Sequence, residues 1–149
     1  MRSLRRFVVV GATILALAVL VPSVSAAPHK HFALTKTCES NVLCTVTWSN
    51  FKPFTPGTDV TYTVNGDGSD GLAYPTIMVK GGSTTGVCDW NHPHGNVLAV
   101  CTFKTGTGTL RGFHLKVDVS VVGDPSSADS IWHWDGTYWF SHRKGHGHR

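Results

Sequence analysis

Residues 113–122 read Phe-His-Leu-Lys-Val-Asp-Val-Ser-Val-Val, and this stretch decides the fold class. Apolar residues occupy every second position from Phe113 to Val121, and polar residues occupy the positions between them. Because side chains along a β-strand point alternately to opposite faces, the pattern predicts a strand with one face in a core and one in water. Such an apolar face needs further strands to cover it, so the surrounding chain should form a β-protein.

Shorter strand-like runs lie on both sides of this stretch, with turn signals between them, and no segment after residue 26 has a helical period. Asp135-Gly136 is a strong hairpin signal, and Pro75 indicates an edge strand because proline cannot donate to a ladder. We therefore predict an all-β, immunoglobulin-like Greek-key β-sandwich of about 7–9 strands with two disulfides. The expected strands are residues 32–37, 43–49, 59–64, 72–80, 87–90, 97–104, 113–122, 131–134 and 137–140.

Residues 1–26 have the form of a secretory signal peptide. Three arginines precede an apolar run at residues 7–21, and Val24-Ser25-Ala26 is a small-residue cleavage site. The apolar run is too short to span a membrane. We therefore expect a secreted, extracellular protein with one domain at residues 27–140 and a disordered, basic, histidine-rich tail at residues 141–149.

The charge balance excludes a strongly basic domain. After residue 26 the chain keeps ten Lys and Arg against nine Asp and Glu, so the net charge falls from +4 to +1. Three of those ten basic residues lie in residues 143–149. The domain therefore has no basic surface for nucleic acid, and we expect a monomer that binds neither nucleic acid nor membrane.

Four cysteines in an exported chain predict two disulfides. We favour Cys38–Cys44 and Cys88–Cys101, because each bond closes a short loop between strand-like runs. A Cys44–Cys101 bond is the alternative, since it would correspond to the inter-sheet bridge of immunoglobulin domains. Against that alternative, Ala99 stands where the tyrosine corner of those domains would place a tyrosine.

Motifs for catalysis and for metal binding are absent or incomplete. The chain has no Gly-x-Ser-x-Gly elbow and no His-Glu-x-x-His motif, and Glu39 is its only glutamate. The glycine-rich loop at residues 65–71 resembles a calcium loop, but Thr76 stands at the position that requires glutamate. Seven of the nine histidines lie at the two ends of the mature chain and in one loop. We therefore expect no catalytic residues, no metal site and no cofactor.

Aromatic residues are concentrated between Trp132 and Phe140, and Trp90 lies in another expected hairpin. Packing all of them inside would overfill the core, so they indicate either core with edge packing or an aromatic-lined binding surface. We expect Trp90 and Trp134 to lie beside the Cys88–Cys101 bond and to remain partly accessible. The candidate ligand-binding residues are Trp90, Trp132, Trp134, Trp139 and Phe103.

Two segments resemble a known family in patches over residues 43–140. Cys88-Asp89-Trp90, with Gly95, Val97-Leu98-Ala99 and Cys101, resembles the Cys-x-Trp…Gly-Val-Leu-Ala-Cys hairpin of the neocarzinostatin family. Trp134-Asp135-Gly136-Thr137-Tyr138-Trp139 is similar to that family's aromatic-Asp-Gly-Thr-x-Trp hairpin. The family consists of secreted actinobacterial proteins that carry enediyne chromophores on an immunoglobulin-like sandwich.

The resemblance implies a bacterial protein with a cleft lined by Cys88, Trp90, Cys101 and Trp134. The chain departs from the family pattern in three ways. It lacks the disulfide that follows the Asp-Gly-Thr hairpin, it has a longer insert before Cys88, and a polar tail replaces the last strand. The resemblance therefore implies a cleft rather than an enediyne ligand.

Three hypotheses for function follow from these patterns. The first is a secreted, non-catalytic binding module whose aromatic-lined cleft takes a small apolar molecule or an aromatic-stacking carbohydrate. The second is a cell-surface or cell-wall interaction protein, and the third is a secreted enzyme of unrecognised type. A tryptophan pair on a concave face would favour the first hypothesis, whereas buried tryptophans under a flat surface would favour the second.

Overall fold

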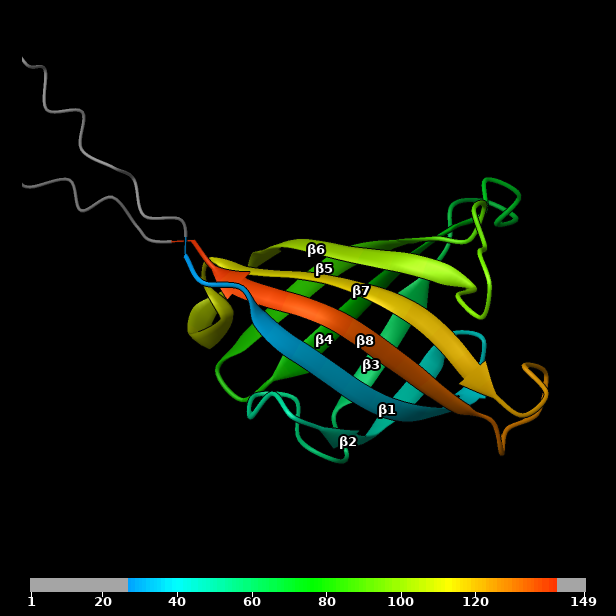
Figure 1. Ribbon diagram of the computed structural model, residues 1–149, viewed down its shortest axis with the longest axis horizontal. Coiled ribbons are helices and arrows are strands. Elements are labelled where there is room, and N and C mark those ends of the chain that lie inside the picture. The colour runs from blue at the N-terminus through cyan, green and yellow to red at the C-terminus, as the bar shows by residue number, and fades with distance from the viewer. Residues whose placement is uncertain (1–26, 142–149) are drawn as a thin grey trace, which may run out of the picture.

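The computed structural model describes residues 27–141, which form a closed antiparallel β-barrel of eight strands (Figure 1). Each strand pairs with its neighbours in chain order, and β1 pairs with β8 to close the barrel. A short 3-10 helix, η1 (Gly108–Leu110), connects β6 and β7. The strands are β1 (Lys30–Ser40), β2 (Leu43–Ser49), β3 (Asp59–Thr63), β4 (Leu72–Val79), β5 (Gly82–Asp89), β6 (Ala99–Gly106), β7 (Phe113–Val122) and β8 (Ile131–Phe140).

This barrel contradicts the predicted immunoglobulin-like Greek-key sandwich. The alternating pattern of β7 indicates that one face of the strand is buried. A buried face can either pack on a second sheet or line the inside of a barrel. The pairing between β1 and β8 distinguishes the two folds, and it runs from Lys30 opposite Tyr138 to Thr37 opposite Ile131. The strand order is therefore up-and-down, and the fold implied by the family resemblance is wrong.

The hairpin predicted at Asp135-Gly136 is also wrong, because β8 runs through both residues without a turn. Gly136 lies opposite Phe32 on one side and Val117 on the other. A Cβ atom at Gly136 would collide with the backbone carbonyl oxygen of Lys116. Glycine is therefore needed here for the close approach of β7 and β8, not for a turn.

Pro75 does not mark an edge strand, since β4 lies between β3 and β5 in the closed barrel. Pro75 is buried and lies opposite Tyr62 of β3. On the β5 side, the pairing is interrupted between Ala73 and Thr76, the stretch that contains the proline. This interruption accommodates a residue that has no N–H to donate.

One end of the barrel is filled by aromatic side chains. Phe51 stacks on Phe113 with 5.1 Å between ring centroids, and Phe54 meets Phe51 edge-on at the same distance. Phe32 and Tyr138 join the cluster from the closing strands β1 and β8. Figure 1 shows η1 and both ends of the described chain at this end of the barrel. The other end carries the β1–β2, β3–β4, β5–β6 and β7–β8 connections.

Both favoured disulfides are confirmed, as Cys38 bonds to Cys44 and Cys88 bonds to Cys101. Each bond joins residues directly opposite one another on paired strands. Two disulfides are compatible with an extracellular protein. The predicted signal peptide (residues 1–26) and residues 142–149 of the predicted tail lie outside the described residues. Among residues 27–141, no helix has the length and apolar character needed to cross a membrane.

Candidate ligand-binding site

A cavity of about 550 Å³ lies at the end of the barrel opposite the aromatic cluster. Its inner wall is built from strands β1, β2, β3, β4, β7 and β8, and its rim from the turns between strands. The volume falls within the range of small-molecule sites, roughly 300–1,000 Å³. The lining residues used below are Lys36, Cys38, Glu39, Cys44, Tyr62, Trp90 and Trp132.

Trp90 and Trp132 form an aromatic pair on the cavity wall. Trp90 follows β5 and Trp132 lies on β8, and their ring centroids are 6.1 Å apart in an edge-to-face arrangement. Both side chains are partly buried and pack against the core. The pair therefore presents apolar ring surface to the cavity, and packing against the core fixes the orientation of both rings.

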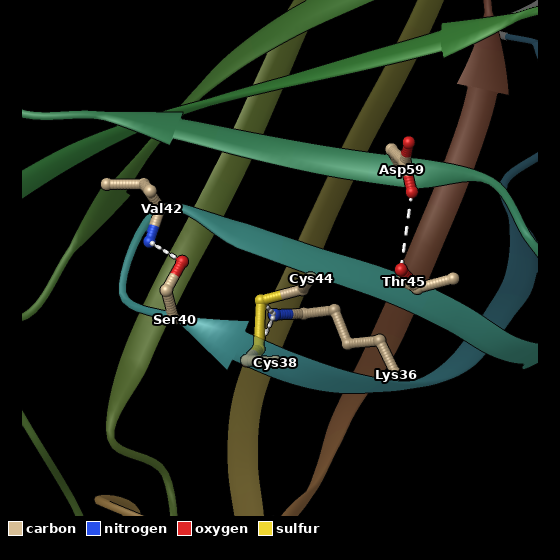
Figure 2. The surroundings of a disulfide bond; sticks show 7 residues. All are labelled: Lys36, Cys38, Ser40, Val42, Cys44, Thr45 and Asp59. Atoms are coloured by element: carbon tan, nitrogen blue, oxygen red, sulfur yellow. Dashed lines mark hydrogen bonds between the residues drawn. A yellow bond between two sulfur atoms is a disulfide. The ribbon is translucent and has the colours of Figure 1, made fainter. Parts of the chain in front are cut away.

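Lys36 is buried inside the barrel, with 2% of its surface exposed. Alternation along β1 places it on the same inward face as Phe32 and Leu34. Its Nζ donates to Sγ of Cys44 at 3.2 Å and to Sγ of Cys38 at 3.6 Å, as Figure 2 shows. Among residues 27–141, no carboxylate forms an ion pair with this amine.

Three aromatic rings surround Nζ of Lys36. Their centroids lie at 4.9 Å for Tyr62, 5.4 Å for Trp134 and 5.5 Å for Trp132. These ring faces favour the ammonium form, but burial acts in the opposite direction and lowers the pKa of Lys36 to about 7. Burial raises the pKa of Tyr62, so its phenol keeps its proton at neutral pH.

Trp134 and Phe103 lie deeper in the barrel than the cavity wall. Trp134 is 1% exposed and Phe103 is 0% exposed, and their rings are 5.6 Å apart. The predicted partial accessibility of Trp134 is therefore wrong, because inward residues on β8 after Trp132 point into the filled part of the barrel. The indole Nε1 of Trp134 is buried and has no hydrogen-bond partner among the described residues.

Trp139 lies on the outer face of β8, away from the cavity. Its ring stacks on His29 at 4.3 Å and on His114 at 5.0 Å between centroids. In one continuous strand, Trp139 has the opposite parity to Trp132 and Trp134, so it faces outward. The structure thus brings Trp90 and Trp132 together in one cavity and separates Trp139 from them.

Sequence reasoning missed Lys36, although a signal for it exists. Phe32, Leu34, Lys36 and Cys38 alternate along one strand face, and a lysine in an apolar register is the exception in that pattern. Neither Lys36 nor Tyr62 was predicted to be a site residue.

A second hollow, of about 770 Å³, lies along the outer side of β3 and β4. Its lining includes Pro53, Thr61 and Met78, and contains no aromatic side chain among the described residues. Met78 is 74% exposed there. This hollow offers a small molecule no ring to stack on, so the cavity inside the barrel is the better candidate site.

Fold and site together define an eight-stranded antiparallel barrel with an aromatic-lined cavity at one end. Comparisons with models of protein families, with curated proteins and with solved structures find no match for this chain. Its function is therefore argued from its own geometry.

Proposed function

We propose that this protein is a secreted, non-catalytic binding protein that holds a small apolar or aromatic molecule in the cavity at the open end of its barrel. The observation that carries this proposal is the Trp90–Trp132 pair on the cavity wall. A flat ligand can stack on one ring while it contacts the edge of the other. A tryptophan pair on a concave face is the feature that favours binding over a surface interaction role.

The rigidity of the cavity supports the same function. The barrel has no free edge, and the Cys38–Cys44 bond ties β1, which carries Lys36, to β2. The Phe51–Phe113 stack and its neighbours fill the opposite end, so a ligand reaches the interior from one side. A preformed site of this kind loses little conformational entropy when its ligand binds.

Export is part of the proposal. The predicted signal peptide would deliver the chain to an oxidising compartment, where disulfides persist. The two disulfides between paired strands are compatible with that destination.

Titration with 2-naphthalenemethanol, a flat and uncharged aromatic alcohol, tests the proposed function. We expect saturable binding, measured by calorimetry and by quenching of tryptophan fluorescence. Trp132→Ala should weaken binding by about tenfold, which corresponds to about 1.4 kcal/mol and to one lost aromatic contact. Trp139→Ala is the matched control, because it removes a tryptophan from the outer face of the same strand, and it should bind like the native protein.

Equal affinity of Trp132→Ala and the native protein would contradict the proposed site, and absence of binding would contradict the proposed ligand class. A β-linked glucose disaccharide should be tested in the same way. Stronger binding of the sugar, with the same loss in Trp132→Ala, would reassign the ligand to aromatic-stacking carbohydrates.

A further inference from the structure

The amine of Lys36 is a feature that binding an apolar molecule does not require. The other lysines of the described residues, Lys30, Lys52, Lys80, Lys104 and Lys116, are exposed. Lys36 instead lines the cavity from the inside of β1. Burying an amine that has no carboxylate partner costs free energy, and an apolar residue at this position would fill the barrel without that cost.

We propose that Lys36 is a carbonyl-reactive amine, and that the cavity takes an apolar or aromatic aldehyde or ketone and holds it covalently as an imine of Nζ. This inference rests on the proposed binding function and deepens it by naming the reactive group of the ligand. The aromatic pair would hold the body of the ligand, and the amine would hold its carbonyl carbon.

The surroundings of Nζ suit a nucleophile. β1 and β2 contribute the Cys38–Cys44 bond, β8 contributes Trp132 and Trp134, and β3 contributes Tyr62, the titratable side chain whose ring faces the amine. Glu39 lines the same cavity but is exposed and forms no ion pair with Lys36. The amine is thus enclosed by apolar rings and a neutral disulfide.

The protonation state of Lys36 agrees with this geometry. A lysine attacks a carbonyl only as the neutral amine, because the ammonium has no lone pair. With a pKa of about 7, about half of the Lys36 side chains are neutral at pH 7. An exposed lysine with the ordinary pKa is neutral in roughly one molecule in 2,500 at that pH.

The reaction needs no co-reactant. The lone pair of Nζ attacks the carbonyl carbon, a C–N bond forms, and the π bond of the carbonyl breaks to give a carbinolamine. The carbinolamine then loses its oxygen together with both amine protons as one water molecule, which leaves a C=N bond. No electrons enter or leave, so the step is a reversible condensation.

Reductive trapping with 2-naphthaldehyde and sodium cyanoborohydride at pH 7 tests the inference. The probe has the ring of 2-naphthalenemethanol and adds only the carbonyl. Hydride reduction of the imine fixes the ligand, and the mass of the protein rises by that of the aldehyde less one oxygen atom. Peptide mapping should place the adduct on Lys36 at least tenfold faster than on Lys80 or Lys116, which serve as exposed controls within the same molecule.

Lys36→Arg keeps a cation but removes the nucleophile, so it should lose the fast adduct while the slow labelling of exposed lysines continues. Labelling of Lys36 no faster than of Lys80 in the native protein would overturn the inference, whether or not the variant folds. If 2-naphthalenemethanol binds and no adduct forms at Lys36, the imine proposal is wrong and the proposed binding function is retained. If neither the alcohol nor the aldehyde binds, both the imine and the proposed ligand class are wrong.

Discussion

Lys36 of β1 and Trp132 of β8 lie directly opposite each other across the strand pair that closes the barrel. The strand pair that closes the barrel thus also contributes to the cavity wall, where Nζ of Lys36 lies 5.5 Å from the centroid of the Trp132 ring. Two residues far apart in the sequence thus become the wall and the reactive group of one site. The effect of this contact on the stability of the protein and its effect on ligand binding can be tested separately.

The stability of the protein should rise with pH between about 7 and 9.5. The pKa of Lys36 is lowered to about 7 in the folded state and returns to an ordinary value on unfolding, so the unfolded state binds the extra proton across this window. The slope should approach about 1.4 kcal/mol per pH unit. Chemical denaturation at intervals of half a pH unit measures it.

Lys36→Met should remove that slope and should be at least as stable as the native protein at pH 6, where the native lysine is charged in both states. Lys80→Met, a change at an exposed lysine, should keep the slope. A native slope that survives Lys36→Met would assign the proton uptake to another group. The measurements should be made below pH 10, because above this pH Tyr62 begins to ionise in the unfolded state.

Trp134 should be essential to stability, whereas Trp48 should not. Trp134 is 1% exposed and packs on Phe103, so Trp134→Ala should cost about 3–5 kcal/mol in the free energy of unfolding. Trp48 is 52% exposed on β2, and Trp48→Ala should change the free energy of unfolding by less than about 0.5 kcal/mol. Urea denaturation of both variants gives the comparison, and similar losses would contradict the burial of Trp134.

Gly136→Ala should destabilise the protein by about 2 kcal/mol or more, because the added methyl group meets the backbone of Lys116 in the middle of the barrel wall. Asp135→Ala is the matched control at the neighbouring position. Asp135 is exposed and pairs with His31, so its loss should cost less than about 1 kcal/mol. Thermal unfolding of both variants distinguishes a continuous β8 from a hairpin, in which Gly136→Ala should cost about 1 kcal/mol or less.

The two disulfides should differ in their effect on binding. On the chain-entropy model, removing Cys38–Cys44 should cost about 2 kcal/mol and removing Cys88–Cys101 about 3 kcal/mol in stability. Cys38 and Cys44 line the cavity and accept from Lys36, so Cys38→Ala/Cys44→Ala should also weaken binding of 2-naphthalenemethanol. Cys88→Ala/Cys101→Ala should bind normally under conditions where it is folded, because Cys88 and Cys101 do not line the described cavity. Equal losses of affinity would show that the disulfides act only through global stability.

Several elements could be predicted from local patterns. The bounds of β2 and β7 match the expected strands, because apolar and polar residues alternate from Cys44 to Ser49 and from Phe113 to Val121. The disulfide pairing was also predictable, since the cysteines flank short turns between strands that pair as neighbours. Trp132 was expected in an aromatic site, and it lines the cavity.

The sequence by itself determined the β class and the inward face of β7, and it favoured the two disulfides, because each of these depends on neighbours along the chain or across one loop. Only the tertiary structure decided between sandwich and barrel, since the pairing of β1 with β8 joins the two ends of the domain and leaves no local mark. The same pairing makes Asp135-Gly136 part of a strand, buries Trp134, turns Trp139 outward and brings Lys36 beside Trp132. The cavity follows from closure of the sheet, and closure is a property of all eight strands together.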